Sequence, residues 1–176
     1  MAKAPRTHPF DLVLAVRLLQ PATTLAPLAE ELGVAPSQVH ASLGRLESAG
    51  LLRPGSRSTN VRALGEFILS GVRYAFPAVR GPLTEGIPTA YSTAPLAAVV
   101  DAIDVVVWPA PQATGRVRGF GLTPLYSRAP VLVERSPETY RIVSIVDAFR
   151  LGDARIRSMA RAELERALGR RLSDAG

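Results

Sequence analysis

Residues 28–46 read LAEELGVAPSQVHASLGRL, and this stretch decides the fold of the N-terminal part of the chain. Gly33 can adopt the left-handed backbone conformation that a tight turn between two helices requires. Three apolar residues then follow at the spacing of one helical face, namely Val39, Leu43 and Leu46. We expect this face to pack back onto the preceding helices. The pattern predicts a helix-turn-helix whose second helix presents its opposite face outwards.

Helix-start and helix-stop residues divide the rest of the first 75 residues in the same way. The predicted helices cover residues 10–19, 25–32, 36–49 and 61–75. Thr24 and Asn60 are suited to cap the second and fourth helices, and Pro36 suits the first position of the third. Residues 51–62 contain Pro54 and Gly55, which favour a short hairpin or loop between the third and fourth helices.

The second part of the chain mixes weaker signals. Residues 77–95 are rich in proline and predict irregular or extended structure. The remaining expected elements are a helix at 96–103, strands at 105–108 and 116–122, and helices at 137–151 and 153–172. Asp153, which follows Gly152, is suited to cap the last helix. The sequence therefore predicts an α+β protein, mainly α, in two parts. A winged helix-turn-helix domain is expected over residues 10–75, and a regulatory or dimerisation region with short strands and two terminal helices over 76–176.

The helix-turn-helix stretch also carries a family resemblance. Residues 28–46, followed by ESAGLL at 47–52, are similar to the winged helix-turn-helix regulators of the multiple-antibiotic-resistance and arsenic-repressor type. The resemblance covers roughly residues 10–75, and the segment 53–60 is shorter than the wing of those families usually is. It implies a transcriptional regulator that binds double-stranded DNA.

In such a domain the outward face of the third helix lies in the major groove and the wing lies against the DNA backbone or minor groove. Glutamine pairs well with adenine, arginine with guanine or phosphate, and serine with phosphate or base edges. The predicted DNA-binding residues are Ser37, Gln38, His40, Ala41, Ser42 and Arg45 on the helix and Arg53, Arg57 and Arg62 in and after the wing.

The charge of the chain points to a polyanionic partner. The formal net charge is +6 and the calculated pI is about 10.7. Residues 1–81 hold nine basic and five acidic residues, a net charge of +4, so the N-terminal half carries most of the excess. Clustered positive charge is typical of nucleic-acid-binding domains.

Several other classes of protein are disfavoured. The chain has no cysteine, and its two histidines, His8 and His40, are far apart in sequence, so we expect no metal site. The carboxylate pairs lack an accompanying histidine base or phosphate-binding loop, so we expect neither a cofactor nor an enzyme. These pairs are Glu30–Glu31, Asp101–Asp104 and Glu163–Glu165. No signal peptide or membrane-spanning stretch is recognisable, and we expect a soluble, cytoplasmic protein without membrane contact.

Two features of the second part leave alternatives open. The aromatic residues Tyr91, Trp108, Phe120 and Tyr126 are suited either to the core or to the pocket of a small-molecule effector. The last helix has an apolar stripe that would pack either on its own chain or on a second copy. A homodimeric repressor on a pseudo-palindromic operator is the main expectation. The alternatives are a protein-interaction module, such as an autoregulating antitoxin that binds a partner protein, and an accessory subunit that uses the winged helix for docking.

Overall fold

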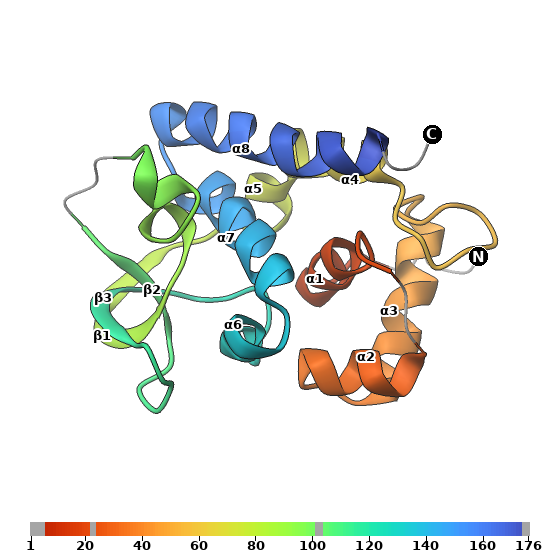
Figure 1. Ribbon diagram of the computed structural model, residues 1–176, viewed down its shortest axis with the longest axis horizontal. Helices are drawn as coiled ribbons and strands as arrows, with labels where there is room; N and C mark the ends of the chain where they lie inside the picture. Colours follow the sequence, from red (N-terminus) through yellow and green to blue (C-terminus); the bar gives the residue numbers. More distant parts are fainter. Residues whose placement is uncertain (1–5, 22–23, 101–103, 174–176) are drawn as a thin grey trace.

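The computed structural model describes residues 6–21, 24–100 and 104–173 and has a mainly helical α+β fold (Figure 1). The α-helices are α1 (Pro9–Arg17), α2 (Leu25–Leu32), α3 (Pro36–Ser48), α4 (Val61–Glu66), α5 (Val72–Ala75), α6 (Leu132–Arg135), α7 (Pro137–Leu151) and α8 (Ala154–Ser173). The strands are β1 (Arg80–Pro88), β2 (Val106–Pro109) and β3 (Val117–Leu122). Short helical turns are η1 (Phe67–Gly71, a π-helix), η2 (Ala90–Ser92), η3 (Leu96–Ala98) and η4 (Ala129–Val131).

The helix boundaries follow the residues that the sequence singled out. Gly33 has φ 67° and ends α2, and the next amide, that of Val34, donates to the carbonyl of Ala29 at 2.9 Å. Asn60 caps α4 by accepting a hydrogen bond from the backbone N–H of Ala63 at 3.2 Å. The predicted fourth helix is present but is interrupted by the π-helical turn η1 between α4 and α5. These contacts confirm the predicted turn and cap.

The sheet is a small closed arrangement in which β1 pairs antiparallel with both β2 and β3, while β2 and β3 pair parallel. The predicted strands at 105–108 and 116–122 correspond to β2 and β3. The prediction for residues 77–95 missed β1 as a regular strand. The predicted helix at 96–103 was too long, because only η3 forms within residues 96–100; residues 101–103 lie outside the described part of the chain.

Helix α7 lies at the centre of the molecule, between α1 on one side and the sheet on the other (Figure 1). Its fully buried Asp147 accepts hydrogen bonds from Trp108 Nε1 at 2.6 Å, Thr89 Oγ1 at 2.8 Å and Arg150 Nη1 at 2.6 Å. Burial raises the pKa of Asp147, and the three donors oppose this rise by stabilising the ionised carboxylate. This network fixes the sheet to α7.

The buried apolar residues on both sides of residue 75 belong to one hydrophobic cluster. Residue 75 is also where α5 ends, so the expected boundary coincides with the end of an element. The segment of η4 and α6 was not foreseen and packs against α2. There Arg135 Nη1 donates to the carbonyl of Glu30 at 2.6 Å, near the negative end of the α2 dipole. The division into two domains stays a prediction.

Helix α8 runs along one side of the molecule over α7 and α4 (Figure 1). Its N-terminus is capped as predicted, because Asp153 accepts a hydrogen bond from the backbone N–H of Ile156 at 2.9 Å. Its apolar stripe, including Leu164 and Leu168, is buried against its own chain, and its outward face is polar. Of the two alternatives for this stripe, the structure therefore has the intramolecular one. Among the described residues, no helix combines the length and hydropathy that a transmembrane helix needs.

Candidate nucleic-acid interface

Helix α3 lies at the end of the molecule opposite the sheet (Figure 1). Val39 and Leu46 are wholly buried against the preceding helices, as predicted. The outward face carries exposed, mostly small and uncharged side chains: Ser37, Gln38, His40, Ala41, Gly44, Glu47 and Ser48. Because few of these side chains are bulky, this face of α3 can lie close to the base edges in the major groove of DNA.

Ser42 was predicted to contact DNA, and the structure contradicts this. The residue is wholly buried, and its hydroxyl donates to Asp11 Oδ1 at 2.7 Å. The reason is helical phase, because Ser42 follows Val39 by three residues and precedes Leu46 by four, which places it on the inward face. Ser42 is therefore removed from the DNA-binding set and becomes a contact between α3 and α1.

Arg45 is engaged by the same carboxylate. Its Nε donates to Asp11 Oδ2 at 2.8 Å and its Nη2 to Asp11 Oδ1 at 2.6 Å. The hydrogen bonds to Asp11 raise the pKa of Arg45. The side chain is 25% exposed, and its Nη1 has no hydrogen-bond acceptor among the described residues. The Nε and Nη2 groups of Arg45 thus bind Asp11, and its Nη1 group is available to a ligand.

The segment after α3 forms a very short hairpin. Its two sides are joined by the bridge between Leu52 and Thr59 and by the hydrogen bond from Arg53 N to Ser58 O at 2.9 Å. Gly55, with φ 67°, follows Pro54 in the turn, where a positive φ suits glycine. Thr59 Oγ1 donates to the carbonyl of Ala15 at 2.7 Å and so ties the base of the hairpin to α1.

The three predicted wing cations are all exposed. Arg53 and Arg57 project from the hairpin, and Arg62 lies on the first turn of α4. None of the three forms an ion pair with a described residue. Unpaired exposed arginines are free to bind phosphate groups.

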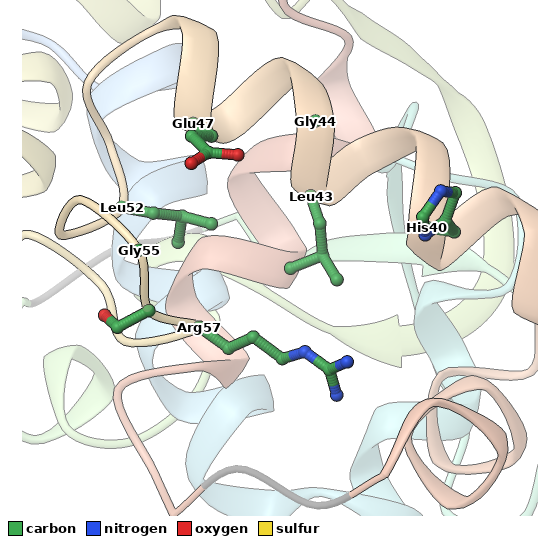
Figure 2. A pocket seen from close by; sticks show the side chains of 8 residues that line it. His40, Leu43, Gly44, Glu47, Leu52, Gly55 and Arg57 are labelled. Carbon is green, nitrogen blue, oxygen red and sulfur yellow. The ribbon is translucent and has the colours of Figure 1, made fainter.

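A groove of about 330 Å³ separates α3 from the hairpin (Figure 2). Figure 2 shows His40 and Glu47 at opposite ends, with Arg57 extending from the hairpin past Leu43 towards the His40 end. Leu43, which was predicted to be buried, is only half-buried and forms the apolar middle of the groove together with Leu52. The groove therefore carries the carboxylate of Glu47 at one end and the guanidinium group of Arg57 beside its apolar middle.

The structure also places the residues considered for other functions. Glu31, Asp104 and Glu163 each form an ion pair with an arginine, at 2.6, 2.7 and 2.8 Å respectively. Within the described part of the chain, no three metal-ligating side chains gather at one point. Carboxylates held in this way serve as structural partners of arginine.

The aromatic residues for which a core place and an effector pocket were both left open do not line an open site together. Tyr91, Trp108 and Tyr126 are buried in the hydrophobic core, and Trp108 is committed to Asp147. Phe120 is half-buried and lies under the guanidinium group of Arg80, 4.7 Å from the ring centroid. For Tyr91, Trp108 and Tyr126 the structure therefore has the core alternative, whereas Phe120 lies at the edge of the sheet's packing with Arg80.

Six of the nine predicted DNA-binding residues combine exposure with a place on α3 or the hairpin: Ser37, Gln38, His40, Ala41, Arg53 and Arg57. Sequence reasoning missed Glu47 as part of this surface, although its place one turn after Leu43 on the same helix was a usable signal. Comparison of the chain with protein-family models, with curated proteins and with solved structures finds no match, so the function is inferred from the surface described above.

Proposed function

We propose that this protein is a sequence-specific, double-stranded-DNA-binding transcriptional regulator that reads bases with α3. The observation that carries the proposal is the exposed polar face of α3 beside a hairpin with two unpaired arginines. Gln38 is the central reader, because its amide group can both donate to and accept from an adenine edge. Arg53 and Arg57 bind phosphate groups, and the net positive charge of the N-terminal half supports the same partner.

The regulator acts in the cytoplasm as a homodimeric repressor, with one copy on each half of a pseudo-palindromic site. Because the apolar stripe of α8 is covered by its own chain, the dimer forms through another surface. The exposed apolar side chains of Tyr74, Val79 and Leu83, which are 71%, 80% and 54% exposed, are available for it.

The test starts from a duplex enriched from random-sequence DNA by the purified protein. Binding of this duplex and of a scrambled one is measured by fluorescence anisotropy at several salt concentrations. Gln38→Ala is expected to weaken binding to the enriched duplex by about 1–3 kcal/mol and to leave binding to the scrambled duplex unchanged. Arg57→Ala is expected to weaken binding to both and to lower the salt slope by about one per half-site.

Arg161→Ala is the matched control, because it removes an exposed arginine from α8, away from α3. It is expected to change neither affinity nor salt slope. If no sequence is enriched, or if Gln38→Ala leaves sequence preference intact, α3 is not the reader.

A second candidate function is supported by the same exposed apolar side chains. Tyr74 lies in α5, Val79 in the link that follows it and Leu83 in β1. Large apolar side chains exposed on one stretch of chain are suited to a protein-protein contact. This exposure favours an interaction module, such as an autoregulating antitoxin, whose partner protein covers these residues. A heteromeric complex that Tyr74→Ser disrupts, with no sequence preference for DNA, would support this alternative.

A further inference from the structure

A second pocket, of about 490 Å³, lies behind the C-terminal end of α3. It is larger than the groove of Figure 2 and falls in the size range of small-molecule sites. Its lining comes from the residues before α1, the residues after α3, and the continuous helical stretch of α4 and η1: Thr7, Ala49, Leu51, Ala63, Glu66, Phe67, Ser70 and Gly71. This pocket was not predicted from the sequence.

The π-helical turn shapes the pocket. Phe67 and Gly71 are the first and last residues of η1, and a Cβ atom on Gly71 would lie 3.0 Å from the Phe67 ring. Because Gly71 lacks that atom, the ring can lie against the helix backbone. The Phe67 ring also packs against Phe76, and the centroids of the two rings are 6.0 Å apart. Single π-helical turns within α-helices occur frequently at functional sites, and this one supplies the only aromatic ring among the lining residues.

The lining has a clear chemical polarity. Ala49, Leu51 and Ala63 provide apolar surface beside the Phe67 ring, and the hydroxyl groups of Thr7 and Ser70 are the neutral polar groups. The carboxylate of Glu66 is the one charged group of the lining, and it has no ion-pair or hydrogen-bond partner among the described residues. An aromatic wall beside an unpaired carboxylate is complementary to a flat apolar molecule that carries a positive charge.

We propose that this pocket binds a small aromatic amine, with the ring of the ligand against Phe67 and its ammonium group beside Glu66. Two of the lining residues, Ala49 and Leu51, connect α3 to the hairpin. Asn60 N donates to the Leu51 carbonyl at 2.9 Å, so the ligand lies against the residues that join α3 to the hairpin. Ligand binding at this pocket does not depend on the proposed DNA-binding function and is measured without DNA.

The test is isothermal titration of the full chain with three probes of similar shape and different charge. The probes are phenethylamine, which is cationic, phenethyl alcohol, which is neutral, and phenylacetate, which is anionic. The expected order of affinity is amine, then alcohol, then acid, with a Kd of about 1 mM or lower for the amine. Glu66→Gln is expected to weaken amine binding about fivefold, the effect of one exposed ion pair, and to leave alcohol binding unchanged.

Two further variants locate the ligand. Ser70→Leu is expected to abolish binding of both amine and alcohol, since Ser70 is exposed and a larger side chain there fills the pocket without disturbing the core. Glu165→Gln, on the exposed face of α8, is the control and is expected to change nothing. The proposal is overturned if the amine does not bind at about 10 mM, if the three probes bind equally, or if Ser70→Leu leaves binding intact. It is also overturned if Ser70→Leu converts a dimer into a monomer, because the pocket is then an interface between copies.

Discussion

Asp11, in the first turn of α1, and Arg45, near the end of α3, form a two-pronged ion pair with N–O distances of 2.8 and 2.6 Å. The same carboxylate accepts hydrogen bonds from Ser42 Oγ and from the backbone N–H of His8, both at 2.7 Å. Because Asp11 is almost wholly buried, this set of contacts fixes both the angle and the register of α3 on α1. The face of α3 that points outwards is a consequence of this contact.

Asp11→Ala is therefore expected to lower the free energy of unfolding by about 3 kcal/mol, because it leaves the buried Ser42 hydroxyl and the Arg45 guanidinium without their acceptor. Urea unfolding followed by circular dichroism measures this change. Glu165→Ala, which removes an exposed carboxylate 3.6 Å from Arg161, is the control and is expected to cost less than about 0.5 kcal/mol. Equal effects of the two variants would mean that the Asp11 contacts do not hold α3 in place.

Arg45→Ala is expected to affect both DNA binding and stability, whereas Gln38→Ala is expected to affect DNA binding alone. The Arg45 variant weakens DNA binding, and it also destabilises the free protein by about 1–3 kcal/mol, since Asp11 loses two of its donors. Thermal unfolding without DNA separates the two effects. Gln38 is exposed and has no described side-chain partner, so Gln38→Ala is expected to leave the unfolding temperature unchanged.

Glu47→Gln is expected to strengthen binding to DNA of any sequence by about twofold to fivefold, because it removes a negative charge from the groove between α3 and the hairpin. The fold should not change, since Glu47 is exposed. The measurement is DNA affinity at low and moderate salt, and the gain should shrink as salt rises. A loss of affinity would show that Glu47 itself contacts the DNA, for example by accepting from a cytosine amino group.

We expect the protein to lose stability at alkaline pH because the hydroxyl group of Tyr126 is buried. Burial raises its pKa, and its hydroxyl has no hydrogen-bond partner among the described residues. An unfolded tyrosine ionises near pH 10, whereas the folded one resists ionisation, so its stabilising contribution is complete below about pH 10 and declines above it. Tyr126→Phe is expected to unfold at the same or higher urea concentration at pH 8 and to lose less stability than the parent at pH 11.

Tyr74→Phe is the matched control for this comparison, because the Tyr74 ring is 71% exposed. It is expected to follow the parent at both pH values. If Tyr126→Phe also follows the parent at pH 11, the Tyr126 hydroxyl is hydrated in solution rather than buried.

Asp147→Ala is expected to destabilise the protein by about 3–5 kcal/mol, because the side chain of Arg150 is only 5% exposed and would be left as an unpaired buried charge. Equilibrium unfolding in urea measures the loss. Trp108→Phe removes one donor to Asp147 but leaves the Arg150 pair intact, and it should cost less. If Asp147→Ala lowers the free energy of unfolding less than Trp108→Phe does, the ion pair between Asp147 and Arg150 is not the main contact of this network.

The local parts of the fold could be predicted from the sequence because their causes are local. Gly33, Asn60 and Asp153 set helix ends through contacts within a few residues, and the structure has them as predicted. β1 was missed because its prolines and glycines are typical of loops. Gly86 is required in the strand, however, since a Cβ atom there would collide with the carbonyl of Trp108, which lies 22 residues further along the chain.

The exposed face of the candidate site could be predicted from the sequence, but the contacts that join α3 to the rest of the protein could not. The exposed residues of α3 follow from helical periodicity once Val39 and Leu46 are placed inwards. Ser42 could have been assigned to the inward face by the same reasoning. The partner of Arg45 could not, because Asp11 is 34 residues away and only the packing of α1 on α3 brings the two together. The pocket beside η1 depends on a π-helical turn, for which the sequence carries no recognised pattern.

Helix α1 is buried along eight consecutive residues, Phe10–Arg17, because α3 covers one side of it and α7 another. During translation, α3 and α7 are synthesised at very different times. Helix α3 begins at Pro36, after the short helix α2, but α7 begins at Pro137, so more than a hundred residues are synthesised before the second apolar side of α1 is covered. During that interval the nascent chain exposes an apolar helix face. We expect ribosome-bound chains that stop before residue 137 to recruit chaperones, and chains that extend past residue 151 to release them.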